Sequence, residues 1–187
     1  MNKALFLDIE TTGFSRQWDN IIEIAAILYD LDSGTELDSF HEYIKPNKKI
    51  PAQVAELTGI TNGLVAGCRS EKEVLMDFTE WFVVTKASTV IGHNCKAFDL
   101  NFIKARCDKY GYTFNYANRE IIDTLVLSRQ LSKANKITVE NHKQPTLAEF
   151  FNIEYQAHSA IEDVRTLIKI YQKLKNLATP SRASLGF

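Results

Sequence analysis

Asp8 and Glu10 are the first residues of this sequence whose types and spacing could do chemistry together. They are separated by one residue in the apolar, strand-like run KALFLDIE, and side chains two apart in a strand point to the same face. Two converging carboxylates repel each other unless one takes up a proton or a cation lies between them. The pair therefore predicts a divalent cation site, with a carboxylate solvated at the end of a strand as the alternative for so short a motif.

The residues around this pair narrow the chemistry. Oxygen ligands without a neighbouring cluster of histidines or cysteines favour Mg²⁺ or Mn²⁺ over zinc. Thr11, Thr12 and Gly13 follow directly. Glycine allows a tight turn there, and backbone N–H and hydroxyl groups of the turn are free to meet a phosphate or a sugar.

Two later segments extend the acidic pattern: HN and FD near residue 95, and HSAIED near residue 160. With DIETTG, they resemble the exonuclease superfamily defined by four carboxylates, in its histidine branch (DEDDh). That superfamily includes bacterial proofreading exonuclease subunits, oligoribonuclease, RNase T and the mammalian three-prime repair exonucleases. The segments ELTGIT at residues 56–61 and DTLVLSR at residues 123–129 also resemble family features, so the resemblance covers most of the chain.

The resemblance implies a role for each motif residue. Asp8 would bridge two Mg²⁺ or Mn²⁺ ions, Glu10 and Asp163 would ligate the tighter ion, and Asp99 would support the second. His158 would be the general base, because an imidazole titrates near neutrality. Residues five apart on one helix point roughly 140° from each other, so His158 is expected to precede the helix that carries Asp163.

The activity implied is a 3'→5' exonuclease that releases nucleoside 5'-monophosphates from DNA with a free, single-stranded or frayed 3' end, in replication, proofreading or repair. The substrate-binding residues it implies are Thr11, Thr12, Gly13, Phe14, His93 and Asn94. Phe14 stands where the family places an apolar residue against the terminal base, and stacking there would tolerate any sequence. Burial of Phe14 in the core is the alternative.

Other functions remain open at this stage. An exoribonuclease or oligoribonuclease would use the same metal chemistry, since a contact to the 2'-hydroxyl cannot be read from a sequence. A non-catalytic nucleic-acid-binding module of a replication complex would keep the fold, although all four carboxylates and the histidine are present. An ATPase is not supported, because no GxxxxGKS/T loop occurs. The six-position step from His93 to Asp99 resembles the three-prime repair branch.

The end of the chain predicts a partner. Residues 182–187, RASLGF, resemble the hexapeptide with which bacterial replication proteins bind the sliding clamp, although arginine stands where that motif has glutamine. We therefore expect an exonuclease domain over residues 1–177 and a tail over residues 178–187 that binds a sliding clamp or a polymerase.

The elements that must position these residues change character along the chain. Three strand-like runs come first and predict an antiparallel meander, and strands then alternate with helices. Residues 132–145 are polar and lack periodicity, which predicts a long surface loop. This pattern predicts an α/β fold with a central five-stranded mixed sheet flanked by helices, and the family resemblance implies that the fold is ribonuclease-H-like. The ranges expected are strands at 3–10, 21–32, 36–44, 88–92 and 120–123 and helices at 52–57, 70–82, 98–110, 124–131 and 160–177.

The composition of the chain limits the number of domains and the kinds of partner that are expected. With 187 residues and 45% hydrophobic content, one domain with a buried core is expected. A net charge of −1 argues against the broad basic surface of a protein that binds duplex nucleic acid through counterion release. The three cysteines form no CxxC pair, and no apolar run approaches the roughly 20 residues that cross a bilayer. A cytoplasmic protein with no membrane contact is expected.

Overall fold

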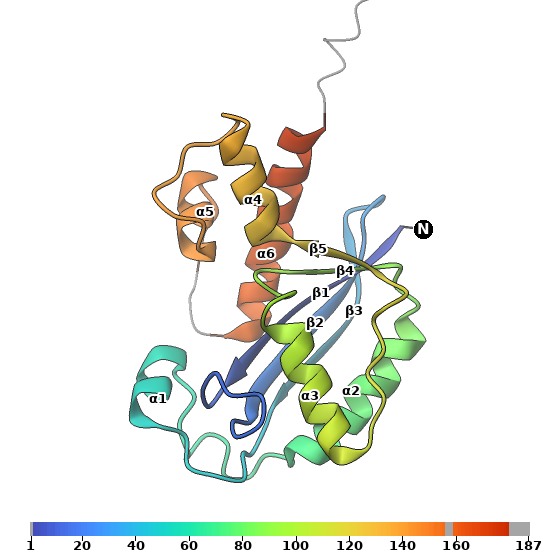
Figure 1. Ribbon diagram of the computed structural model, residues 1–187, viewed down its shortest axis with the longest axis vertical. Helices are drawn as coiled ribbons and strands as arrows, with labels where there is room; N and C mark the ends of the chain where they lie inside the picture. Colours follow the sequence, from blue (N-terminus) through green and yellow to red (C-terminus); the bar gives the residue numbers. More distant parts are fainter. Residues whose placement is uncertain (1, 156–158, 180–187) are drawn as a thin grey trace, which may run out of the picture.

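Five strands form one mixed sheet in a computed structural model of the chain (Figure 1). The structure describes residues 2–155 and 159–179, so the predicted base His158 and the predicted clamp-binding segment lie outside the described residues. The sheet order is β3-β2-β1-β4-β5, with β1, β2 and β3 antiparallel and β4 and β5 parallel to β1. The expected meander and mixed sheet are confirmed. The strands are β1 (Lys3–Thr11), β2 (Ile21–Asp30), β3 (Thr35–Tyr43), β4 (Thr89–Gly92) and β5 (Glu120–Asp123).

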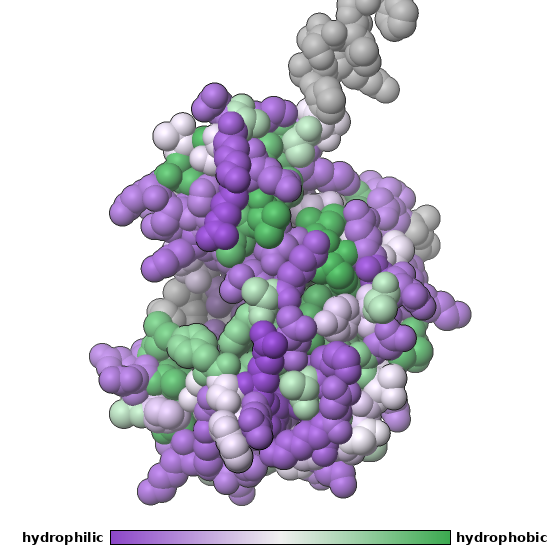
Figure 2. All heavy atoms as spheres, viewed as in Figure 1, coloured by the Kyte–Doolittle hydropathy of each residue, from purple (hydrophilic) through white to green (hydrophobic). Residues whose placement is uncertain are grey.

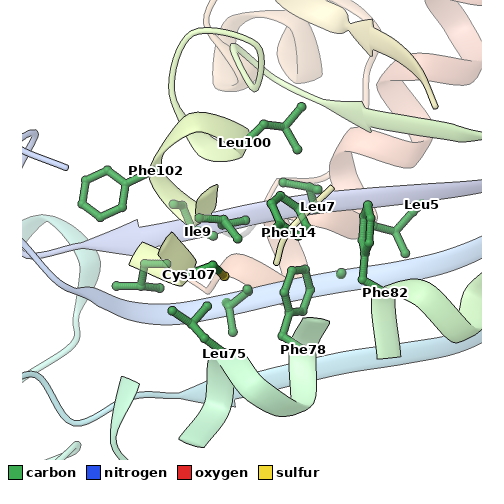
Figure 3. Packing of buried hydrophobic residues seen from close by; sticks show 14 of the residues in the cluster. Leu5, Leu7, Ile9, Leu75, Phe78, Phe82, Leu100, Phe102, Cys107 and Phe114 are labelled. Carbon is green, nitrogen blue, oxygen red and sulfur yellow. The ribbon is translucent and has the colours of Figure 1, made fainter. Parts of the chain in front are cut away.

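Helices cover both faces of the sheet. The helices are α1 (Ala52–Thr58), α2 (Glu71–Thr85), α3 (Asp99–Tyr110), α4 (Thr124–Lys133), α5 (Gln144–Phe150) and α6 (Ala160–Ala178). Apolar side chains of α2 and α3 pack on one face in the largest core cluster, shown in Figure 3. Val164, Leu167 and Tyr171 of α6 pack on the opposite face. None of the described helices is long and apolar enough to traverse a bilayer.

The alternation of β1 decides where its acidic residues point. Leu5, Leu7 and Ile9 belong to the cluster under α2 and α3, whereas Phe6 belongs to the cluster under α6. Asp8 and Glu10 continue the Phe6 side at two-residue spacing. The face under α6 therefore changes from apolar to acidic at the end of β1, close to the first turn of α6.

Two local patterns in the sequence predict helix boundaries: Gly59 as the stop of the first helix, and Ser70 with Glu73 as the capping box of the second. Gly59 ends α1 with φ 71°, in the left-handed region that glycine enters without strain. Ser70 and Glu73 form the expected capping box at the start of α2.

The face of the molecule seen in Figure 2 is mostly hydrophilic, with hydrophobic groups separated by polar ones.

The predicted loop over residues 132–145 is wrong in its extent. Helix α4 continues to Lys133, and α5 begins at Gln144. The sequence carries little signal for α5, because the helix has seven residues and no side-chain cap, and isolated helices of that length are unstable. Leu147 and Ala148 of α5 pack in a separate cluster with residues of α4 and α6, so tertiary packing stabilises this helix.

Candidate active site

Three carboxylates from distant parts of the sequence meet at one end of the sheet. One carboxylate oxygen each of Asp8, Glu10 and Asp163 lies within 4.8 Å of the other two. Asp8 and Glu10 come from β1, and Asp163 comes from the first turn of α6. They line a cavity of about 210 Å³ together with His93, Gln144 and Tyr155. The expected convergence of Asp8 and Glu10 is confirmed, and α6 brings Asp163 to them.

Asp99 lies beside this cluster and comes from a different element, helix α3. It is 3% exposed at the first position of α3, and the backbone N–H of Ile9 donates to its carboxylate. The pairing of β1 with β4 ends at Phe6, so β1 can bind α3 at Ile9 instead. The Asp99 charge acts on Asp8 and Glu10. All four predicted carboxylates are therefore gathered at the end of β1.

The electrostatics of the cluster fit a cation. Burial, followed by the charges of Asp99, Glu10 and Asp163, raises the pKa of Asp8 well above its ordinary value. Burial and then Asp163 raise the pKa of Glu10 to about 7. When these carboxylates are ionised, their mutual repulsion destabilises the folded protein. A divalent cation bound between them removes that repulsion. The donors are all oxygens, which suits a hard ion.

These shifts predict the pH dependence of the metal-free protein's stability. The pKa values of Glu10 and Asp99 are about 7 in the folded protein against ordinary values of 4.5 and 3.8. Between about pH 4 and pH 7 the folded state therefore binds more protons than the unfolded state, so this contribution to stability is complete below that window and falls as pH rises through it. In EDTA, Tm should fall from pH 5 to pH 8, and Mg²⁺ should restore more of it at pH 8.

Thermal unfolding with and without Mg²⁺ at both pH values measures this effect. The double variant Glu10→Gln, Asp99→Asn is the control, because it removes the two groups whose pKa values are about 7 and leaves Asp8 and Asp163 in place. Its Tm in EDTA should change less than that of the wild type between pH 5 and pH 8. An increment of Tm in Mg²⁺ that is the same at pH 5 and pH 8 would contradict the assignment of charge repulsion to this cluster.

The turn after β1 is fixed by Asp19. Its carboxylate accepts hydrogen bonds from the Ser15 backbone N–H at 2.8 Å and the Thr12 hydroxyl at 3.1 Å, and it pairs with Lys48. A Cβ on Gly13 would lie 2.6 Å from the Asp19 carboxylate, so this glycine is required by the close approach of that side chain. The Thr11 hydroxyl donates to Gly13 O at 2.7 Å, so both threonine hydroxyls donate within the turn and the expectation that they are free to meet a phosphate is wrong. These bonds make the turn rigid.

The predicted substrate residues occupy different positions around the site. Phe14 is 90% exposed, so the alternative of a core phenylalanine is wrong. Its ring lies 6.2 Å from that of Phe98, the residue before α3. His93 lines the acidic cavity, and its Nδ1 lies 2.9 Å from the Thr124 hydroxyl. The backbone N–H of Asn94 donates to Asp123 at 2.9 Å, while the Asn94 side chain is exposed.

The structure adds three residues that the sequence analysis missed. The Tyr155 hydroxyl hydrogen-bonds Asp163, and burial raises the pKa of Tyr155. Gln144 Nε2 donates to the Asp163 backbone oxygen at 2.9 Å. Glu23 lies opposite Glu10 in the sheet, is fully buried, and has His41 Nε2 at 2.7 Å. Only Glu23 left a sequence signal, as an acidic residue inside the apolar run of β2; the other two lie in segments without periodicity.

A sheet of this order, with helices on both faces and acidic residues gathered at the end of its first strand, has the ribonuclease-H-like fold. The family follows from comparison with known proteins. A family model described as Exonuclease (RNase_T) matches residues 5–171. The chain belongs to this exonuclease family, and the family expected from the motifs is confirmed.

Two curated relatives are similar along nearly the whole chain. DNA polymerase III PolC-type of Caldanaerobacter subterraneus subsp. tengcongensis is 35% identical over 184 residues, which is 96% of this chain and 12% of that protein. The 3'-5' exonuclease DinG of Bacillus subtilis is 34% identical over 193 residues, 99% of this chain and 19% of that protein. The chain thus spans less than a fifth of the length of these relatives.

Solved structures agree on the fold. E. coli Exonuclease I in complex with a dA16 oligonucleotide superposes with a TM-score of 0.83 at 21% identity, over 94% of this chain and 41% of that one. At 21% identity this similarity shows a shared fold.

Proposed function

We propose that this chain is a 3'→5' exonuclease that hydrolyses the terminal phosphodiester bond of DNA, at single-stranded or frayed 3' ends, and releases nucleoside 5'-monophosphates. The observation that carries the proposal is the gathering of Asp8, Glu10 and Asp163 oxygens within 4.8 Å, with Asp99 beside them, in a chain of the exonuclease family. Membership of the family supplies the reaction class, and the cluster supplies a place for it.

The carboxylates would hold two Mg²⁺ or Mn²⁺ ions. Asp8, Glu10 and Asp163 would ligate one ion, and Asp99 with Asp8 would support the other. When bound, such cations increase the acidity of water and stabilise charge on the departing 3' oxygen. Glu23 lies opposite Glu10 in the sheet, and its charge acts on Asp8 and Glu10, which favours cation binding at this end of the sheet.

The remaining roles belong to side chains around the cluster. His158 would accept the proton of the attacking water. The turn formed by Thr11, Thr12 and Gly13, which Asp19 keeps rigid, would contact the terminal phosphate or sugar. Phe14 would contact the terminal base, and its 90% exposure supports this role. Tyr155 would keep the Asp163 carboxylate oriented through its hydrogen bond.

The preference for DNA rests on relatives. A DNA polymerase of PolC type and a 3'-5' exonuclease are similar to this chain at about a third identity, and Exonuclease I with a dA16 strand shares its fold. These similarities favour a role in DNA replication, proofreading or repair over an exoribonuclease. Binding of a clamp or polymerase through residues 182–187 stays a prediction from the sequence.

A degradation assay tests the function directly. Purified protein is incubated with 5'-labelled single- and double-stranded DNA and with RNA of the same sequence, in Mg²⁺, Mn²⁺ or EDTA. We expect a ladder that shortens from the 3' end of single-stranded DNA, no cleavage in EDTA, and slower cleavage of RNA. Internal cuts, or shortening from the 5' end, would refute the proposal, and equal cleavage of RNA would refute the substrate preference.

A further inference from the structure

A second exposed aromatic residue lies beyond Phe14 on the same turn. Trp18 is 71% exposed, and it lines a groove of about 810 Å³ with Arg16, Asn47 and Lys109. In Figure 1 the loop between β1 and β2 lies at the lower end of the sheet, between α1 and α3. An exposed indole offers a flat apolar face with a polar N–H at its edge, which a stacking ligand can cover.

The loop presents Trp18 in a fixed position. The Trp18 and Asp19 backbone N–H groups donate to Ser15 O at 3.2 and 2.7 Å. Arg106, buried under the loop, donates to Gln17 O at 3.4 Å. A residue exposed on so well bonded a turn loses little conformational freedom when a ligand binds, which favours affinity.

The loop follows α3 from its start toward its end. Phe14 contacts Phe98 before the helix, Arg16 donates to Ala97 O at 2.7 Å, and Trp18 shares the groove with Lys109 near the last turn. Ala105 is the first residue of α3 that lines the groove, and it lies about 10 Å along the helix from Phe98. At 3.4 Å per nucleotide of a stacked strand, that length corresponds to about three nucleotides.

The charge of the groove suits a phosphate backbone. The Arg16 guanidinium bonds a neutral carbonyl and keeps its positive charge, and Lys109 adds a second. The acidic residue of the groove, Asp108, is bonded by Lys104 at 3.0 and 2.7 Å. Aromatic faces combined with cationic side chains are the recurring means of binding single strands without sequence preference.

We infer that the Trp18 groove is a second binding site for the single-stranded substrate, which stacks a base about three nucleotides upstream of the 3'-terminal nucleotide on Trp18 while Arg16 and Lys109 contact its phosphates. The inference rests on the proposed exonuclease function and extends it from the terminal nucleotide to the strand behind it. It requires a length dependence: substrates shorter than four nucleotides do not reach Trp18.

Steady-state kinetics on dT12 and on the dinucleotide dT2 test the groove. Trp18→Ala should raise the KM for dT12 about tenfold, which corresponds to the loss of one stacked base, and leave the KM for dT2 unchanged. Trp18→Phe should restore most of the affinity. The control is Val84→Ala, an apolar residue that is 73% exposed on α2, which should change neither KM. Lys109→Ala should lower the salt dependence of log KM for dT12 by about 0.7.

Fluorescence separates binding at the groove from hydrolysis. The sequence has two tryptophans, Trp18 and Trp81, so Trp81→Phe leaves Trp18 as the reporter. A dT12 strand with hydrolysis-resistant 3' phosphorothioate linkages should quench it, and dT2 should not. Hydrolysis of dT12 with no quenching and no KM change in Trp18→Ala overturns the groove and leaves the exonuclease function standing. Equal KM changes for dT2 and dT12 overturn it as well, whereas no hydrolysis of either refutes the function itself.

Discussion

Asp163→Asn is expected to abolish hydrolysis, by at least about a thousandfold in kcat, while the protein stays folded. The Asp163 carboxylate supplies one of three oxygens that lie within 4.8 Å of one another, and an amide of the same shape lacks the charge that holds a cation. The substitution also removes a charge that raises the pKa values of Asp8 and Glu10, so the metal-free variant should be no less stable than the wild type. Turnover on labelled single-stranded DNA and Tm in EDTA measure the two effects.

Glu162→Gln is the matched control for this variant. Glu162 neighbours Asp163 in the first turn of α6, and its carboxylate pairs with Arg165 at 2.5 Å, partly exposed to solvent. Its loss should leave turnover within about twofold, because surface ion pairs contribute little. Metal binding followed by calorimetry should weaken in Asp163→Asn alone. Turnover in Asp163→Asn comparable with that of the control would refute the site.

Arg106→Leu is expected to lower the free energy of unfolding by ~3–5 kcal/mol, the cost of breaking a buried ion pair. Arg106 is 1% exposed and Glu71 is 2% exposed, and Arg106 Nε donates to Glu71 Oε1 at 2.9 Å. Without the guanidinium, the Glu71 carboxylate stays buried with only neutral donors: the Ile21 N–H, the Asn20 amide and the Tyr110 hydroxyl. Urea denaturation monitored by circular dichroism measures the loss.

A second substitution tests the reason for this loss. Glu71→Gln in the Arg106→Leu background removes the unpaired charge, so it should recover part of the stability. Arg165→Leu, which breaks a partly exposed pair, should cost less than about 1 kcal/mol. Equal losses for Arg106→Leu and Arg165→Leu would show that burial of the pair does not decide its contribution.

The same pair connects the fold to the site. Glu71 at the start of α2 holds Asn20 and Ile21 at the end of the turn, and Arg106 of α3 holds Gln17 within it. The turn that carries Gly13, Phe14 and Trp18 is therefore fixed by a buried charge pair from α2 and α3 as well as by the hydrogen bonds of Asp19 within it. Arg106→Leu should for that reason also raise the KM for dT12.

Local patterns predicted most of the elements. The capping box at Ser70 and the Gly59 stop are confirmed because their hydrogen bonds join residues a few positions apart. Helix α5 was missed because seven residues without a cap carry too little local preference, and Leu147 is buried only by helices from elsewhere in the chain. Prediction failed where stability depended on remote packing.

The sequence by itself determined that Asp8 and Glu10 share a face, because a strand alternates with a period of two. The sequence also determined the exonuclease family, because the family's motifs are defined by residue types that occur in the same order along this chain. The family resemblance implied that Asp163 joins the β1 carboxylates. Only the tertiary structure decided how α6 brings it there, that Tyr155 and Glu23 border the cluster, and that Arg106 helps to fix the turn. The physical reason is that these contacts join elements distant in sequence, and only their combined packing buries the charged groups. Burial raises carboxyl pKa values and makes the loss of one partner of an ion pair costly, and no local pattern encodes it.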